Sequence, residues 1–392
     1  MPKIPKVILL IEASRTCGRG LLLGIAKYSH LHGPWAFYRR PLFYLHPDRR
    51  KKALSLLKNS DADGIIMDKA YFSDTEIDRA IISMGLPAIS TAIEAQIPGL
   101  ANILTDNVRI ARMAAEHLLE RGFRHFAYCG FDAIFWSKER SEVFAKRVAQ
   151  AGFRTSFYKQ PKSRVKRLWE NEQNLVADWL KSLPKPVGLM ACNDDRGQEV
   201  IEACNIAGLH VPDEVAIIGV DDDKLICGLT DPSLSSIPLN FERAGYEAAE
   251  LLDKLMAGEK LANRNIIIRP THIVSRQSTD ILAIDDREVA AAAHFIRQHA
   301  SQEIHVGDVV NAVALSRRVL EKRFRRILGR SVHDEIRRVR VGQVARMLVE
   351  TNLPVSRIAL SLGYPGVDHI ARYFRREKEM SLLAYRKKYG GK

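Results

Sequence analysis

Residues 358–386 read IALSLGYPGVDHIARYFRREKEMSLLAYR, a short apolar segment followed by a glycine, a proline and a strongly basic segment. Apolar residues recur at helical spacing in both segments, which predicts helices Val355–Leu362 and Pro365–Lys378 with a turn between them. The predicted core consists of Ile358, Ala359, Leu362, Ile370, Tyr373 and Phe374. Two short helices on one core, the second with a basic outer face, indicate a helix-turn-helix unit over about residues 355–378.

Residues 305–328 repeat this pattern, with predicted helices Val306–Val313 and Arg317–Leu328. Ser316 lies in the turn and is expected to cap the second helix. Between the two units, Ser331 is expected to begin a helix of about 20 residues that ends near Thr351 and is about 30 Å long. One turn of B-DNA is about 34 Å, so this spacer is expected to set two recognition helices into successive major grooves. Two further helices are predicted at Glu288–Ala300 and Ser381–Lys388.

Positive charge is concentrated in this C-terminal part of the chain. Residues 287–392 contain 22 Lys+Arg and 10 Asp+Glu, so they carry +12 of the chain's net charge of +14. An ordinary solvated helix face mixes the two signs more evenly, and a compact basic domain indicates double-stranded DNA as the partner. The predicted DNA contacts are Ser316, Arg317, Arg318, Glu321, Lys322, Arg325, Val367, Asp368, His369, Arg372, Arg375 and Arg376.

The larger N-terminal part alternates continuous apolar runs with amphipathic helical segments. Continuous apolar runs are typical of strands buried on both faces, which predicts an α/β fold with parallel sheets and, from its length, two lobes. The predicted strands are Val7–Ile11, Trp35–Tyr38, Gly64–Met67, Pro87–Ser90, Phe126–Cys129, Gly188–Cys192 and Val215–Val220. The predicted helices are Gly20–Ser29, Arg50–Leu57, Thr105–Arg121, Ser137–Ala151, Leu168–Leu183, Asp194–Ala207 and Phe241–Ala257.

Polar residues follow several of these strands. Ligands of open parallel sheets bind at the carboxyl ends of the strands, and carboxylates and amides there suit the hydroxyls of a sugar. Trp136 is expected to stack on the sugar and Arg140 to donate to it. The alternative is that the Asp and Asn residues cap the helices that follow. The predicted ligand-binding residues are Ser14, Arg15, Asp68, Trp136, Arg140, Asn193, Asp194, Asp221 and Asp222.

Gly18, Gly20 and Gly24 follow the first strand, and Arg39 and Arg40 end the next one. A dinucleotide-binding fold uses such residues for the pyrophosphate and a 2′-phosphate. Residues 12–17 intervene between the strand and the first glycine, which argues against that function. The alternative interpretation is a helix whose small residues permit close contact with a neighbour.

Other classes of protein find little support. No apolar run reaches the roughly 18 residues that span a membrane, and the run after Lys6 ends at Glu12 without a signal-peptide cleavage site. The 5 widely spaced cysteines suit reduced thiols in the cytoplasm. No nucleophile–base pair and no metal-ligand spacing is evident, so we expect no enzymatic activity, no cofactor and no metal.

The C-terminal motifs resemble the arabinose-regulator (AraC) family of DNA-binding proteins. Residues 308–331, DVVNAVALSRRVLEKRFRRILGRS, are similar to the first helix-turn-helix unit of that family. The departures are Ile370 for an aromatic residue, Glu379 for glycine and Leu382 for proline, and they affect the second unit and the final turn. In residues 358–386, the positions that match its signature are Ile358, Ala359, Gly363, Tyr364, Arg372, Phe374, Arg375, Arg376, Tyr385 and Arg386.

The N-terminal part resembles a different family. Residues 104–130 (LTDNVRIARMAAEHLLERGFRHFAYCG) and 193–225 (NDDRGQEVIEACNIAGLHVPDEVAIIGVDDDKL) are similar to the sugar-responsive core of the lactose-repressor family, which is related to periplasmic sugar-binding proteins. The resemblance implies a two-lobed sensor with three crossovers and a cleft. Members of that family carry their DNA-binding helices at the N-terminus, where this chain begins with a strand.

The expected organisation is therefore a periplasmic-binding-protein-like sensor over residues 1–281 and an all-α DNA-binding domain over 288–392, with a linker at 282–287. Lobe 1 is expected at about 6–121 plus 239–260, and lobe 2 at about 122–238 plus 261–280. The combination resembles bacterial regulators of xylose use, which implies a homodimeric activator that responds to D-xylose and contacts RNA polymerase. A repressor, a sensor of another monosaccharide, a transport-type sugar-binding protein and an NADP-dependent enzyme remain the alternatives.

Overall fold

The structure is a computed structural model of the 392-residue chain. It describes residues 4–39, 57, 61–69, 75–91, 100–163, 165, 168–259, 265–281, 283 and 286–390. The predicted helix Arg50–Leu57 lies outside these residues except for Leu57, and so does Arg40. The chain forms two compact units. The first unit comprises Met1–Asn107, Ala133–Trp136 and Leu239–Pro270, and the second comprises Val108–Asp132, Ser137–Pro238 and Thr271–Lys392.

The first unit is built on a parallel sheet in the order β11-β5-β4-β3-β1-β2. Its strands are β1 Lys6–Leu10, β2 Ala36–Tyr38, β3 Gly64–Asp68, β4 Ala88–Thr91, β5 Ala101–Thr105 and β11 Asn265–Ile268. Its helices include α1 Thr16–His32, α3 Thr75–Met84 and α9 Phe241–Met256. Every residue of β3 is buried, as its continuous apolar run predicts, and the parallel sheet is confirmed.

Helices α1 and α9 lie in close contact through glycines. A Cβ on Gly24 would lie 1.9 Å from the Glu242 carbonyl oxygen, and one on Gly245 would lie 2.1 Å from the Leu21 carbonyl oxygen. Gly20 similarly faces Phe241, with 2.6 Å between an added Cβ and the Phe241 Cβ. The interpretation as a helix contact is therefore confirmed for Gly20 and Gly24, whereas a Cβ on Gly18 would lie 1.6 Å from the Glu12 carbonyl oxygen in the segment before α1.

The second unit contains a parallel sheet in the order β10-β9-β8-β6-β7. Its strands are β6 His125–Cys129, β7 Thr155–Phe157, β8 Val187–Ala191, β9 Val215–Asp221 and β10 Ser235–Pro238. The accompanying helices are α4 Asn107–Leu119, α5 Phe135–Gln150, α6 Trp169–Ser182, α7 Asp194–Ala207 and α8 Lys224–Leu229. Buried apolar residues of β6, β8, β9 and α7 share one core, in which Leu189 and Ile217 are fully buried.

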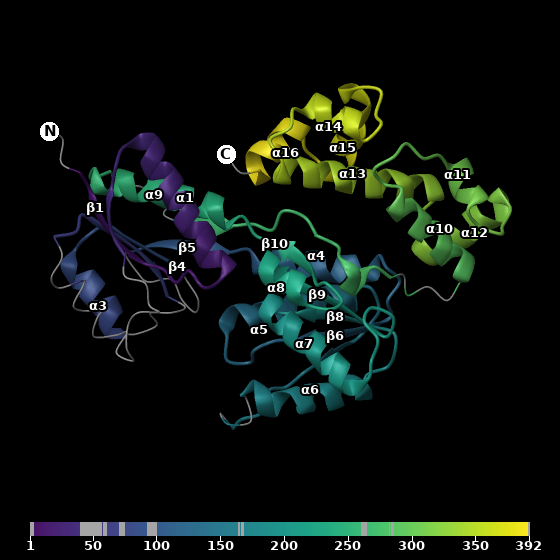
Figure 1. Cartoon of the computed structure of the whole chain (residues 1–392), viewed down its shortest axis with the longest axis horizontal. Helices are drawn as coiled ribbons and strands as arrows, with labels where there is room; N and C mark the ends of the chain where they lie inside the picture. The colour runs from purple at the N-terminus through teal and green to yellow at the C-terminus, as the bar shows by residue number, and fades with distance from the viewer. Residues whose placement is uncertain are drawn as a thin grey trace. The chain divides into compact units, whose positions relative to one another are not determined.

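The C-terminal part of the second unit is entirely helical (Figure 1). Its helices are α10 Arg287–Gln298, α11 Val306–Asn311, α12 Arg317–Leu328, α13 Val332–Glu350, α14 Val355–Ser361, α15 Val367–Lys378 and α16 Leu382–Tyr389. One core contains Phe324 and Ile336, and the other contains Leu348 and Phe374. Helix α13 contributes to both cores and runs between the two helix-turn-helix units, which confirms their predicted arrangement (Figure 1).

The termini of these helices differ from the prediction in detail. Ser331 caps α13 as expected, because its hydroxyl accepts a hydrogen bond of 3.1 Å from the Asp334 N–H. Ser316 occupies the N-cap position of α12 but makes no capping hydrogen bond with its side chain, so that expectation was wrong. Tyr373 is only half-buried, whereas the other predicted core residues of the second helix-turn-helix unit are buried.

The boundaries of the two lobes also need correction. The prediction placed residues up to 121 in lobe 1, but α4 from Val108 onward belongs to the second unit. It placed residues 261–280 in lobe 2, but β11 pairs in parallel with β5 and therefore belongs to the first sheet. Arg287, placed in the linker, is the first residue of α10, which Asp286 caps.

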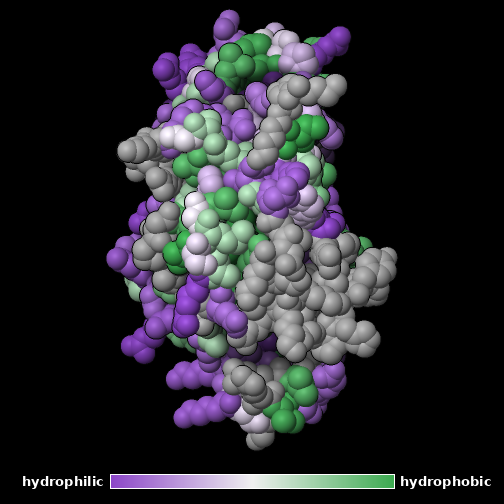
Figure 2. Space-filling model, turned by 90° about the vertical axis from the view of Figure 1, so that its left-hand side faces the viewer, coloured by the Kyte–Doolittle hydropathy of each residue, from purple (hydrophilic) through white to green (hydrophobic). Residues whose placement is uncertain are grey.

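The face in Figure 2 carries hydrophobic residues in small groups among hydrophilic ones. In the described part of the chain, no helix has the length and apolar character needed to cross a membrane. All 5 cysteines lie in that part and form no disulfide, and 4 of them are buried.

Candidate effector site and nucleic-acid interface

The first unit places several of the predicted effector residues at strand ends. Ser14 and Arg15 follow β1 and are exposed, and Arg15 stands at the N-cap position of α1. Asp68 ends β3 and is buried, and its carboxylate accepts a hydrogen bond of 2.8 Å from the hydroxyl of Thr91 at the end of β4. Trp136 also belongs to this unit and is half-buried. The paired strand ends therefore present a polar edge.

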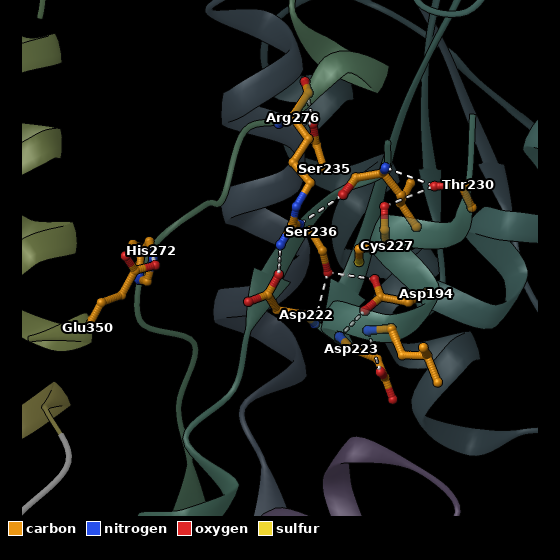
Figure 3. Close-up of polar contacts among 12 residues, drawn as sticks. Asp194, Asp222, Asp223, Cys227, Thr230, Ser235, Ser236, His272, Arg276 and Glu350 are labelled. Atoms are coloured by element: carbon orange, nitrogen blue, oxygen red, sulfur yellow. Dashed lines mark hydrogen bonds and ion pairs between the residues drawn. The ribbon is translucent and has the colours of Figure 1, made fainter. Parts of the chain in front are cut away.

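A buried carboxylate lies at the strand ends of the second unit. Asp194, the first residue of α7, is 2% exposed. Its Oδ1 accepts a hydrogen bond of 2.5 Å from the Ser236 hydroxyl of β10, and its Oδ2 accepts one of 2.7 Å from the Asp223 N–H (Figure 3). Burial, followed by the negative charge of Asp221, raises the pKa of Asp194 well above 3.8. The carboxylate therefore joins α7, β10 and the turn after β9.

That turn has an unusual backbone. Asp221 ends β9 with a φ of 106°, and Asp222 follows with a φ of 53°. A non-glycine residue in this region stores about 1–3 kcal/mol of strain, which surrounding contacts must offset. Here Arg276 Nη2 donates a hydrogen bond of 2.6 Å to Asp222 Oδ1, and the Asp222 N–H donates one of 3.0 Å to Ser236 Oγ (Figure 3). The turn is thus held by one ion pair and one hydroxyl.

Two other predicted residues have structural partners. Arg140 of α5 is 4% exposed, and its Nη1 donates a hydrogen bond of 2.5 Å to the Cys192 carbonyl oxygen beyond β8. Asn193 caps α7 by accepting a hydrogen bond of 3.0 Å from the Arg196 N–H. The capping alternative therefore describes Asn193 and also Asp223, whose Oδ1 accepts a hydrogen bond of 3.1 Å from the Leu225 N–H in α8. Asp194 and Asp222 share a cluster through Ser236.

Sequence reasoning missed three members of this cluster, namely Asp223, Ser236 and Arg276. Ser236 lies in a short strand, β10, whose serines give it no apolar signature. Arg276 meets Asp222 from 54 residues further along the chain, and spacing gives no indication of such a contact. For Asp223, the run of three aspartates was a sufficient signal, because it directly follows the predicted strand.

The predicted recognition helices, α12 and α15, both present basic outer faces. On α12, the side chains of Arg317, Arg318, Lys322 and Arg325 are exposed together with Ser316, and Glu321 is half-buried at 3.7 Å from Arg325 Nε. On α15, Val367 is half-buried, and the exposed residues are Asp368, His369, Arg372, Arg375 and Arg376. Buried Leu320 and Phe324 anchor α12, and buried Ile370 and Phe374 anchor α15. Exposed guanidinium groups on anchored helices can bind phosphates or guanine edges.

Helix α15 ends in an unfavourable conformation. Its C-cap residue is Glu379, with a φ of 55°, whereas α12 ends at Gly329 with a φ of 69°. Left-handed backbone at this position favours glycine because it has no Cβ. The second helix-turn-helix unit therefore keeps the left-handed C-cap conformation, but glutamate occupies that position instead of glycine. Among the described residues, no group of three or more His, Cys, Asp or Glu side chains is arranged to hold a metal ion.

Two family profiles match the chain. Residues 115–279 match a periplasmic binding protein-like domain, and residues 309–388 match a helix-turn-helix domain. The first match contains the sheet of the second unit together with α9 and β11 of the first unit, and the second match extends from within α11 to α16.

Several relatives align with nearly the whole chain. The xylose operon regulatory protein of Haemophilus influenzae is 30% identical over 97% of this chain and 98% of its own length. The protein of the same name from Escherichia coli is 29% identical over 97% of this chain and 96% of its own length. A solved structure of a xylose-binding transcription activator is 27% identical, covers 100% of both chains and has a TM-score of 0.60. In this chain a periplasmic binding protein-like domain precedes a helix-turn-helix domain, and the chain belongs to the family of xylose operon regulatory proteins.

Proposed function

We propose that this protein binds D-xylose and, in response, activates transcription of genes for xylose catabolism. The observation that carries the proposal is the joining of a strand-end polar cluster and two exposed basic recognition helices in one chain. The family supports xylose as the effector, since relatives over the full length are named for the xylose operon.

The proposed sugar ligands are the predicted ligand-binding residues of each unit. Asp194, Asp222 and Arg140 of the second unit, with Asp221 and Asn193 beside them, are proposed to supply acceptors and donors for sugar hydroxyls. From the first unit, Ser14, Arg15 and Asp68 are proposed as polar ligands and Trp136 as the apolar surface for the sugar ring. Charged hydrogen-bond partners that are already held in place lose little freedom on binding, which favours affinity.

The proposed binding to DNA uses both helix-turn-helix units. Exposed arginines of α12 and α15 are proposed to contact base edges and phosphates in successive major grooves. Helix α13 has 19 residues, which corresponds to a length of about 28 Å. This length is close to one helical turn of DNA, so a single chain is proposed to span two adjacent half-sites.

Sensors with two lobes commonly form symmetric dimers, and we propose a homodimer in the cytoplasm that contacts RNA polymerase when it activates. The relatives are transcription regulators, and we infer that this chain acts as a regulator and not as an enzyme.

Isothermal titration of the full chain with D-xylose, other pentoses and hexoses tests the sugar proposal. We expect a saturable heat for D-xylose, weaker or no heat for the others, and a loss of affinity of about tenfold or more in Asp222→Asn. Asp213→Asn is the matched control, because Asp213 is exposed and precedes the same strand. No heat with any monosaccharide at millimolar concentration would refute the proposal.

A further inference from the structure

Helix α13 is attached to the sensor part of the second unit near its N-terminal end. Arg338 on α13 forms an ion pair through Nη1 with Glu120 Oε2, just beyond the end of α4. The same guanidinium donates to Glu335 at 2.9 Å and 3.0 Å. Glu120 therefore contacts a side chain that α13 already holds in one orientation.

The residue after Glu120 connects this ion pair to the interior of the sensor. Arg121 is buried, and its Nε donates a hydrogen bond of 2.7 Å to the Thr279 carbonyl oxygen. Its Nη2 donates one of 3.1 Å to Ser275 Oγ, and its own carbonyl accepts one of 2.8 Å from the Ala283 N–H. Arg121 thus fixes the segment that leads from the sensor towards α10.

The same segment reaches the strained turn of the candidate effector site. Thr279 Oγ1 donates a hydrogen bond of 2.7 Å to Ser235 Oγ, which accepts another of 2.7 Å from the Arg276 N–H. Arg276 in turn holds Asp222 through an ion pair of 2.6 Å. Hydrogen bonds therefore run from Asp222 through Arg276, Ser235 and Thr279 to Arg121, and the backbone joins Arg121 to Glu120, which pairs with Arg338.

The C-terminal end of α13 has a second attachment. Glu350 Oε1 lies 3.1 Å from His272 Nε2, and the two side chains face each other in Figure 3. The Tyr385 hydroxyl of α16 donates a hydrogen bond of 2.9 Å to the Thr271 carbonyl oxygen. Thr271 is the first residue of the second unit after the chain leaves the first unit at Pro270. These two contacts therefore hold the segment through which the chain passes from the first unit to the second.

We propose that these two attachments form the surface through which the sensor controls both helix-turn-helix units. Helix α13 is the element whose movement transmits the effect of the ligand to them. A ligand that alters the Asp222 turn or the crossover segment acts on opposite ends of one helix. Because α13 belongs to the cores of both helix-turn-helix units, moving it moves both recognition helices together. Such control requires that the ligand favour one arrangement of the helix over another. The inference deepens the proposed function and rests on it.

The test compares full-length Glu120→Gln and Tyr385→Phe with the parent. Glu120→Gln removes the charge from the sensor side and leaves the Arg338–Glu335 pair intact. Tyr385→Phe removes one hydroxyl from the crossover contact. The controls are Glu116→Gln, which alters an α4 glutamate that pairs with Arg147 at 3.3 Å, and Tyr364→Phe, whose ring lies against Arg340 within the helical part.

Two readouts are needed. The first is hydrogen exchange of α13 and of residues 271–283 in the sugar-free protein, followed by mass spectrometry. We expect exchange to rise about two- to fivefold in both variants, in line with a partly exposed ion pair or one hydrogen bond, and to stay at the parental rate in the controls. If both variants exchange at the parental rate in α13 and in residues 271–283, the proposed attachment of α13 to the sensor is wrong.

The second readout is fluorescence anisotropy with a duplex selected from random sequence, measured with and without D-xylose. We expect the ratio of the two DNA dissociation constants to fall towards 1 by about two- to fivefold in each variant and to keep its parental value in the controls. Parental ratios in both variants would overturn the inference. A parent that binds DNA without any response to xylose would refute the proposed function, while the exchange readout still decides whether α13 is attached.

Discussion

Glu335 provides a sharp test of how the DNA-binding part is held together. It lies on α13 with 1% of its side chain exposed, and its carboxylate accepts hydrogen bonds from Arg330 Nε at 2.5 Å and from Arg338 at 2.9 Å and 3.0 Å. Burial alone raises the pKa of Glu335, but the hydrogen bonds and charges of Arg338 and Arg330 outweigh it and lower the pKa to about 2. Relative to an ordinary value of 4.5, this is worth roughly 3 kcal/mol at neutral pH.

Glu335→Gln should therefore destabilise the helical part by about 3 kcal/mol, since it removes the buried carboxylate that the half-buried Arg330 and Arg338 share. Because the pKa is depressed in the folded state, the stabilisation is complete above about pH 4.5 and is lost as the pH falls towards about 2. Variant and parent should converge over that range.

Native-state hydrogen exchange of the full chain measures this effect in α13 peptides, whichever other parts of the chain unfold separately. Glu303→Gln is the control, because the Glu303 side chain is 57% exposed and lies 3.9 Å from His305, so its removal should change the opening free energy by less than about 0.5 kcal/mol. An opening free energy of α13 that falls by less than about 1 kcal/mol in Glu335→Gln would refute the electrostatic reasoning.

Three further predictions follow from glycine positions and from the readers. Gly24→Ala should destabilise the first unit by about 3 kcal/mol in urea unfolding, since its Cβ would lie 1.9 Å from a carbonyl oxygen. Gly228→Ala is the control and should not lower the free energy of unfolding, because no heavy atom lies within 4 Å of its added Cβ. Equal effects of the two substitutions would contradict the helix contact. Glu379→Gly should stabilise the second reader by about 0.5–1 kcal/mol in hydrogen exchange of α15 and α16, and a loss of protection there would show that the left-handed residue is not strained. Arg317→Ala and Arg372→Ala should each weaken binding to a selected duplex by about 1–3 kcal/mol in gel shifts at physiological salt, and parental affinity in both would disprove the groove assignment.

Much of the fold could be predicted because local pattern and long-range structure agree. The bounds of α7 and α12 coincide with the predicted Asp194–Ala207 and Arg317–Leu328, since each has an amphipathic repeat and a clear end. The predicted strands of both sheets carry continuous apolar runs because their residues are buried, as β3 and β8 show. Strand β10, with two serines in four residues, gives no such signal although its serines are buried.

The candidate site was predictable only in part. Polar residues directly after strands, such as Asp68, Asp194 and Asp222, follow from the general position of ligands on parallel sheets. Their partners do not, because Arg276 and Ser236 reach the cluster from other segments of the chain. The Glu120–Arg338 pair spans 218 residues, and no local pattern indicates which exposed glutamate will meet which arginine.

The most direct test of the central claim is the affinity of the full chain for a selected DNA duplex, measured by fluorescence anisotropy at fixed salt with and without saturating D-xylose. A sugar-responsive regulator should show a DNA dissociation constant that changes by about fivefold or more with D-xylose and is insensitive to sugars that give no heat of binding. The same dissociation constant with and without every monosaccharide tested, up to millimolar concentration, would contradict the account.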